Sequence, residues 1–321
     1  MNNSFTEIAE KLGGAGRIYL FPHENPDGDA VGSTAALCSM LRDMGKECYV
    51  MIEEELPENL RFMDDDMFVI PEENVERPDL SVAVDCSETS RFSKLKDLFL
   101  SGGYTISIDH HENEKPSFDM NYIDPGAAAA GELIYKLMKE MDHIPSKKEA
   151  EALFAAITTD TGNFQYSNTT RETHSIICDL YESGIDISSV STEIYENESP
   201  EKIRLICRAV SEMELLFGGK LALTRVTQDM LKETGTVMSD AEPVIKEIRS
   251  VRGVEIAIVL KERGPGKVFV SMRSKSYASV LEIARELGGG GHQKAAGCTL
   301  NMTVDEAEEA VLKAAKKQLE S

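Results

Sequence analysis

The sequence lacks the features of membrane-spanning and of disulfide-stabilised proteins. Its apolar runs, such as residues 254–260 with Glu255 inside, fall far short of the roughly 20 residues that cross a bilayer. The six cysteines are scattered and no two form a CxxC pair, which is a poor framework for disulfides or for a thiolate metal site. The chain starts with Glu7 and Glu10 in place of a basic and then apolar leader. We therefore expect a cytoplasmic protein with reduced cysteines and no membrane segment.

Basic residues are scarce in the first part of the chain, whereas acidic residues are abundant there. Residues 1–200 contain 39 Asp and Glu against 15 Lys and Arg, and residues 201–321 contain 17 against 19. A surface this acidic repels the phosphate backbone of a long nucleic acid, so we do not expect long DNA or RNA as a partner. The same carboxylates could instead hold cations. With 321 residues the chain is long enough for two domains.

The first half alternates short apolar runs with helical patterns, which is typical of a parallel sheet in an α/β domain. The expected strands are residues 17–21, 47–52, 80–84 and 104–108, and the expected helices are residues 33–44 and 127–142. Ligands of such sheets bind at the carboxyl ends of the strands. We therefore expect functional residues where these strands end.

The helical pattern breaks up between residues 183 and 200, where we place the connection between two domains. The expected elements after it are strands 220–226, 253–260 and 267–272 and helices 240–249, 279–287 and 303–320. Gly264-Pro265-Gly266 joins two of these strands as a turn. The prediction is an N-terminal parallel-sheet α/β domain over residues 1–185, a linker and helix over 186–213, and a smaller C-terminal α/β domain over 214–321.

Imidazole and carboxylate groups are concentrated directly after the first predicted strand. His23, Asp27 and Asp29 lie in the Pro/Gly-rich segment 22–33. Donors of this kind in a tight turn can point at a common centre, as a divalent metal requires. An Asp-Gly turn with carboxylates that cap a helix gives the same pattern, so this segment alone does not decide between the two interpretations.

Three further acidic or histidine clusters follow other predicted elements. Asp85 follows strand 80–84, Asp109-His110-His111 follows strand 104–108, and Asp160 follows a largely apolar helix. Each cluster alone could be a solvated loop or a helix cap. Four such clusters at element ends on one side of a sheet are hard to explain as surface residues, so together they predict a metal site.

The order of these residues resembles the four motifs of the DHH phosphoesterases. The motif residues are His23-x-x-x-Asp27-x-Asp29, then Asp85, then Asp109-His110-His111, then Asp160-Thr161-Gly162. In the second half, Ser271-Met272-Arg273-Ser274 and the run GGGGHQKAAG from Gly288 to Gly297 resemble the signature of the associated DHHA1 domain. Within that family the chain is similar to the NrnA type, which comprises nano-RNases and 3′-phosphoadenosine-5′-phosphate (pAp) phosphatases.

The resemblance implies a centre of two metal ions. The implied ligands are His23, Asp27 and Asp85 for one ion and Asp29, Asp85, His110 and Asp160 for the other, with Asp85 as the bridge. Mixed oxygen and imidazole donors suit Mn²⁺ better than Mg²⁺, so we expect Mn²⁺, with Mg²⁺ or Co²⁺ as substitutes. By the same resemblance Asp85, Asp109 and His111 are catalytic, with Asp109 in an orienting position and His111 facing the substrate phosphate.

A glycine run in the second half predicts a substrate-binding loop. Gly289, Gly290 and Gly291 would let backbone N–H groups approach a phosphate, and Arg273 and His292 would add charge-assisted contacts. A flexible glycine linker is the other interpretation. An apolar helical stripe at Val280, Ile283, Ala284 and Leu287 leads directly into the run, which favours a loop with a defined position.

The expected activity is hydrolysis of very short oligoribonucleotides, from dinucleotides to about pentanucleotides, to mononucleotides, together with dephosphorylation of pAp. The same residues would serve a signalling phosphodiesterase for cyclic di-AMP or linear dinucleotides. A non-catalytic nucleotide-binding regulator is a third alternative. The methionine-rich segment 133–141 suits either a core or a dimer face, so the sequence does not decide whether the protein is a homodimer.

Overall fold

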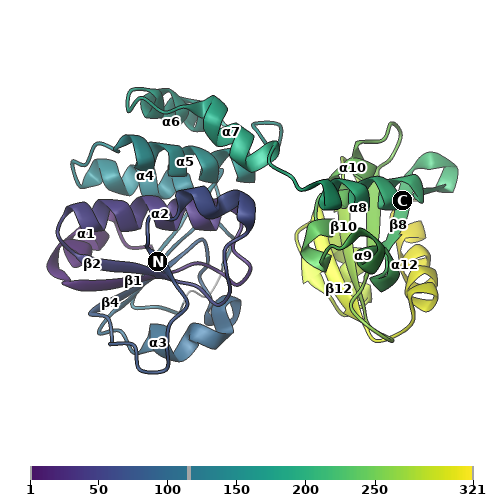
Figure 1. Ribbon diagram of the computed structural model, residues 1–321, viewed down its shortest axis with the longest axis horizontal. Coiled ribbons are helices and arrows are strands. Elements are labelled where there is room, and N and C mark those ends of the chain that lie inside the picture. The colour runs from purple at the N-terminus through teal and green to yellow at the C-terminus, as the bar shows by residue number, and fades with distance from the viewer. Residues whose placement is uncertain (1, 114–116, 320–321) are drawn as a thin grey trace. The chain divides into compact units, whose positions relative to one another are not determined.

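The chain divides into two compact units, Met1–Asn197 and Glu198–Ser321 (Figure 1). The computed structural model describes residues 2–113 and 117–319. The predicted linker, residues 186–213, contains two helices, α7 (Ile187–Tyr195) and α8 (Pro200–Ser211). Val190 of α7 is part of the first unit's core and Leu205 of α8 is part of a core of the second. The serine-rich composition of α7 conceals the apolar stripe that packs it onto the first unit.

The first unit is built on a six-stranded sheet in the order β3-β2-β1-β4-β5-β6. Every neighbouring pair is parallel. The strands are β1 (Arg17–Phe21), β2 (Glu47–Met51), β3 (Phe68–Val69), β4 (Leu80–Val84), β5 (Thr105–Asp109) and β6 (Met120–Ile123). The four strands expected from the sequence are present, whereas the short strands β3 and β6 were not expected.

Helices cover both faces of this sheet (Figure 1). The helices are α1 (Phe5–Gly14), α2 (Gly28–Asp43), α3 (Lys96–Leu100), α4 (Ala130–Glu140), α5 (Lys147–Asp160) and α6 (Arg171–Tyr181), with 3-10 helices η1 (Glu58–Met63) and η2 (Thr89–Leu95). Ile18 and Leu20 of β1 enter the large core beneath α2, α4 and α5, and the alternate residues Tyr19 and Phe21 enter a smaller aromatic core on the other face. The sheet is therefore buried on both sides, as a parallel sheet requires.

The second unit has a mixed six-stranded sheet in the order β11-β12-β10-β9-β8-β7. Among the strands that the structure describes in this sheet, only β8 and β9 pair in parallel. The strands are β7 (Glu214–Leu216), β8 (Leu221–Val226), β9 (Ile256–Glu262), β10 (Val268–Ser274), β11 (Gly290–Gly291) and β12 (Ala295–Leu300). The remaining helices are η3 (Phe217–Gly219), α9 (Gln228–Thr234), η4 (Met238–Ala241), α10 (Val244–Ser250), α11 (Val280–Glu286) and α12 (Val304–Leu319). Cores lie on both faces, one with α11 and α12 and the other with α8, α9 and α10.

The observed architecture confirms the expected α/β class, with a parallel-sheet unit followed by a smaller mixed unit. Within residues 2–113 and 117–319, no helix combines the length and the hydropathy that a bilayer crossing requires.

Candidate metal centre

The candidate centre lies where the strand order of the first sheet reverses. From β1 the chain moves outward to β2 and β3, and then returns to the other side of β1 with β4. The carboxyl ends of strands at such a switch point border a crevice. His23 follows β1, Asp85 follows β4, and Asp109 is the last residue of β5, so all three lie at this edge.

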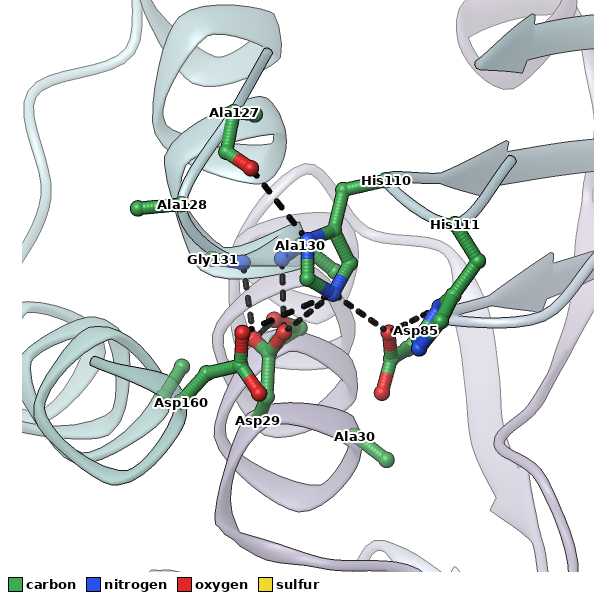
Figure 2. Close-up of polar contacts among 12 residues, drawn as sticks. Asp29, Ala30, Asp85, His110, His111, Ala127, Ala128, Ala130, Gly131 and Asp160 are labelled. Carbon is green, nitrogen blue, oxygen red and sulfur yellow. Dashed lines mark hydrogen bonds and ion pairs between the residues drawn. The ribbon is translucent and has the colours of Figure 1, made fainter. Parts of the chain in front are cut away.

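Two glycines let helix α2 lie directly against helix α5. A Cβ atom on Gly28 would lie 2.4 Å from the side chain of Thr159, and one on Gly32 would lie 2.3 Å from the carbonyl oxygen of Ala152. Because only glycine allows this approach, α2 brings Asp29 next to Asp160, the last residue of α5. Figure 2 shows the two carboxylates turned toward one another and toward His110.

Helix α2 begins at Gly28, five residues before the helix expected from the sequence. The Asp27 side chain caps it by accepting the N–H groups of Asp29 and Ala30, both at 3.1 Å. Asp29 therefore lies in the first helical turn, where the sequence pattern had indicated an irregular turn. The capping interpretation of Asp27 is correct, and it coexists with a place in the cluster.

His23 forms one side of the cluster. Its Nε2 atom lies 3.5 Å from Oδ2 of Asp85 and 3.8 Å from Oδ1 of Asp27. Its Nδ1 atom lies 2.8 Å from the carbonyl oxygen of Glu24, to which it can donate. This hydrogen bond leaves Nε2 as the atom that faces the carboxylates, which is the arrangement of a metal-binding histidine.

His110 forms the other side of the cluster in the same way. Its Nε2 atom lies 3.4 Å from Asp85, 3.6 Å from Asp29 and 3.7 Å from Asp160. Its Nδ1 atom lies 3.3 Å from the carbonyl oxygen of Ala127 (Figure 2). Nε2 of His110 thus faces three carboxylates from three different elements.

Asp85 lies between the two histidines. One of its oxygens is near His23, and the other is near His110 and 3.4 Å from Nδ1 of His111. The residue is 2% exposed and has a left-handed backbone, with φ of 62°. Such a conformation is uncommon for a non-glycine residue, although aspartate and asparagine adopt it more readily than other side chains. Each carboxylate oxygen of Asp85 is thus placed to serve a different ion.

The donor set fits divalent cations. Among the described residues, Oδ1 of Asp85 and Nε2 of His110 are buried without a hydrogen-bond partner. Buried polar atoms are almost always satisfied, so unsatisfied donors and acceptors that face one another indicate a missing partner. Three groups of potential ligand atoms each fall within 4.8 Å, namely His23 with Asp27 and Asp85, Asp29 with His110 and Asp160, and Asp85 with His110 and His111. Carboxylate oxygens with imidazole nitrogens are ligands for Mn²⁺ and related ions.

The electrostatics of the histidines show how strongly this cluster attracts positive charge. Burial disfavours the charged imidazolium of His23, but Asp27 and Asp85 outweigh burial and raise its pKa to about 10. Burial also opposes charge on His110, whose pKa is nevertheless raised to about 10 by Asp85 and Asp29.

The pKa values of two carboxylates, Asp29 and Asp160, are raised as well. Burial, together with Asp85 and Asp160, holds the pKa of Asp29 well above its usual range. Burial is also the main reason that the pKa of Asp160 rises to about 6. Without a metal the cluster therefore takes up protons, and a divalent cation would supply the same positive charge in their place.

Asp109 and His111 form a pair beside the cluster. Asp109, 1% exposed, accepts the backbone N–H of His111 at 3.0 Å and lies 2.9 Å from its Nδ1 atom. Hydrogen bonding to Asp109 raises the pKa of His111. The His111 side chain is 40% exposed. The pair thus joins a buried carboxylate to an accessible imidazole at the edge of the site.

The predicted substrate-binding residues gather at one end of the second sheet. Arg273 on β10 and Gly291 on β11 pair with Ala295 and Ala296 of β12, so they flank the same strand from both sides. His292 closes the turn by donating its backbone N–H to Ala295 at 2.7 Å. The strand pairing and this turn therefore bring Arg273, Gly291 and His292 to the same end of the sheet.

The glycine run is a helix end followed by a strand. Gly288 has a φ of 78° and ends helix α11, as the apolar stripe predicts. Gly290 and Gly291 form β11, where a loop was expected. A Cβ atom on Gly289 would lie 2.2 Å from a carbonyl oxygen of β12, whereas one on Gly290 would meet open space. Close packing explains Gly289, and it does not explain Gly290.

Sequence reasoning missed the residues that support the cluster. Asn168, in the loop after α5, contacts Asp160, and residues 127–131 contact both Asp29 and His110. The run of small residues at 127–131 was the available signal, since a backbone can approach a site closely only where side chains are small.

Comparisons with known protein families identify two domains in this chain. Residues 17–157 match the model of the DHH family, N-terminal domain, and residues 218–321 match that of the DHHA1 domain. The bifunctional oligoribonuclease and PAP phosphatase NrnA of Thermus thermophilus is 32% identical over 306 residues, which cover 95% of this chain and 90% of that protein. The protein of the same name from Bacillus subtilis is 27% identical, over 92% of this chain and 93% of its own length.

A solved structure is similar over almost the whole chain. The exopolyphosphatase-related protein from Bacteroides fragilis superposes with a TM-score of 0.91 at 25% identity, and the match covers 98% of this chain and 95% of that one.

Proposed function

Because this chain belongs to the DHH family, with a DHH domain followed by a DHHA1 domain, we propose that it is a two-metal phosphohydrolase of very short oligoribonucleotides and of pAp. The observation that carries the proposal is the position of Asp85, whose two oxygens face two separate groups of potential ligands. The similarity to the oligoribonuclease and PAP phosphatase of Thermus thermophilus supports the substrate class.

The proposed ligands follow the geometry of the cluster. His23, Asp27 and Asp85 would hold one ion, and Asp29, Asp85, His110 and Asp160 the other. We propose Mn²⁺ because imidazole and carboxylate donors occur together, with Mg²⁺ and Co²⁺ as weaker alternatives. Two such ions would activate water for attack and neutralise the negative charge of a phosphate group.

The protein's own groups would orient the substrate. His111, held by Asp109, is accessible and would donate to a phosphate oxygen. Arg273, His292 and the backbone of Gly290 and Gly291 would bind a further phosphate of the substrate. The N–H of Gly289 instead donates to the carbonyl oxygen of Ala284 at 2.7 Å, so Gly289 would shape the loop without binding the phosphate. The scarcity of basic residues in the first unit favours short substrates, because long strands need many cationic contacts.

Parallel turnover assays with Mn²⁺ test the proposal. The substrates are pApA, a five-nucleotide RNA, pAp, cyclic di-AMP and pyrophosphate, with Asp85→Asn as the inactive control. Release of mononucleotides from pApA and the RNA, and of phosphate from pAp, is the expected result. Preference for cyclic di-AMP would instead indicate a signalling phosphodiesterase, and absence of turnover on all five would indicate a nucleotide-binding regulator.

A further inference from the structure

Two proposed ligands of one metal ion are tied to the same short backbone segment, residues 127–131. The carboxylate of Asp29 accepts the N–H of Ala130 at 2.6 Å and that of Gly131 at 2.9 Å (Figure 2). His110 contacts the carbonyl oxygen of Ala127 through Nδ1. The start of helix α4 therefore fixes an aspartate from α2 and a histidine that follows β5 against each other.

Asn168 ties the third proposed ligand to the same segment. Its Nδ2 atom donates to the carbonyl oxygen of Ala128 at 3.0 Å and to that of Asp160 at 3.2 Å, and it lies 3.5 Å from Oδ2 of Asp160. The peptide that it grips is itself held, because the buried Glu132 accepts the N–H of Ala128 at 3.2 Å. One amide side chain thus connects Asp160 with the segment that holds Asp29.

The backbone that follows Asp160 has an unusual conformation, which makes a restraint on Asp160 useful. Asp160 is the last residue of α5, and the next residues include three in succession with left-handed φ, namely Gly162 at 56°, Asn163 at 57° and Phe164 at 62°. Asparagine adopts this conformation more readily than most residues, but Phe164 is strained there and keeps it only where its surroundings hold it. The end of the helix is therefore a place where a ligand could shift unless another element restrains it.

We propose that Asn168 is a positioning residue for Asp160 and so for the metal site of Asp29, His110 and Asp160; this inference rests on the proposed function. The role requires a donor, because both groups that Asn168 contacts at hydrogen-bond distance are carbonyl oxygens. An aspartate at this position would have nearly the same shape, but it would offer only acceptors and would repel the carboxylate of Asp160.

Titration of the metal-free, full-length protein with Mn²⁺ tests this role. The variants are Asn168→Ala, Asn168→Asp and the control Thr169→Val, whose lost hydroxyl is buried without a hydrogen-bond partner among the described residues. Calorimetry should resolve two Mn²⁺ ions per wild-type chain. In Asn168→Ala one ion should bind about 10- to 100-fold more weakly and the other unchanged, as expected when a group that orients a ligand is removed. Asn168→Asp should lose at least as much affinity, and Thr169→Val should match the wild type.

The outcomes separate this inference from the proposed function. If wild-type protein binds two ions and turns over pApA while both Asn168 variants bind Mn²⁺ like it, the positioning role is wrong and the proposed function stands. A milder loss in Asn168→Asp than in Asn168→Ala would show that the side chain only fills space. A variant whose metal-free form unfolds at a clearly lower temperature would point to a structural role, which also overturns the inference. If the wild type neither binds Mn²⁺ nor hydrolyses any substrate, the proposed function itself fails.

Discussion

The two units each contain a six-stranded sheet, yet they place their candidate functional groups in different ways. In the first unit the strands are parallel, and buried side chains converge at their carboxyl ends. In the second unit the candidate groups lie around one hairpin of a mixed sheet, and they include the backbone of a glycine run. Parallel strands bring together residues that are far apart in the chain, whereas a hairpin brings together near neighbours. The first arrangement suits a centre with many ligands, and the second suits a phosphate loop.

We expect Asp85→Asn to lower turnover more than any other substitution and to leave the second unit unchanged. Turnover of pApA should fall by a factor on the order of 10³ or more, because both proposed ions lose a ligand and the phosphate loses its neutralising charge. Asparagine tolerates the left-handed backbone that Asp85 adopts, so the fold should be kept. Steady-state kinetics and the number of Mn²⁺ ions bound per chain measure the effect.

The same variant makes a prediction about stability. Wild-type protein should unfold at a higher temperature with Mn²⁺ than without, since a ligand of the folded state stabilises it. Asp85→Asn should lose this increase, and at neutral pH its metal-free form should unfold at a lower temperature than the metal-free wild type, because the imidazolium groups of His23 and His110 each lose a charged partner. The exposed Asp97→Asn on α3 is the matched control. Normal turnover by Asp85→Asn would show that this metal centre does not take part in catalysis.

The affinity for Mn²⁺ should rise with pH. In the metal-free protein the pKa values of His23 and His110 are about 10, so both imidazoles carry a proton at pH 7 to 9. A metal binds the neutral ring, and each proton that it displaces weakens binding by up to about tenfold for every pH unit below that value. Calorimetry in buffers of different ionisation enthalpy should detect nearly two protons released per chain from the imidazoles, in addition to protons that Asp29 releases because its pKa is also raised. Release of none would contradict the placement of these histidines.

Substitutions of two adjacent glycines should separate structure from binding in the second unit. Gly291 has a φ of 136°, and a Cβ atom there would lie 2.6 Å from the carbonyl oxygen of Ala295. Gly291→Ala should therefore lower the free energy of unfolding by about 1 to 3 kcal/mol, as measured with urea. Gly290→Ala meets open space and should change it by less than about 0.5 kcal/mol.

If the backbone of Gly290 contacts a phosphate, the Gly290→Ala substitution should change the KM of the enzyme. Gly290→Ala should raise KM for pApA several-fold, because a methyl group would keep a phosphate from the backbone, and kcat should change little. An unchanged KM would mean that this strand does not bind substrate and that the glycines serve only the packing of the hairpin.

The strands that are buried on both faces were predicted correctly from the sequence. β1 and β4 were expected with the bounds that the structure shows, because a parallel strand covered on both faces is a continuous apolar run. β12 was not expected, since its sequence AAGCTL consists mostly of small residues without a strand pattern. It forms because β10 and β11 pair with it on both sides. Pairing of this kind is a property of the tertiary structure.

The sequence by itself determined the chemistry of the candidate centre. Aspartate and histidine at the ends of apolar strands predict a cation site, and the acidic first unit predicts that long nucleic acids are repelled. Only the tertiary structure decided which atoms face one another. Asp29 meets Ala130, which lies 101 positions later in the chain, and Asp160 is tied to the same segment through Asn168. Such contacts depend on how helices and loops pack on an open parallel sheet, and no local pattern of side chains encodes them.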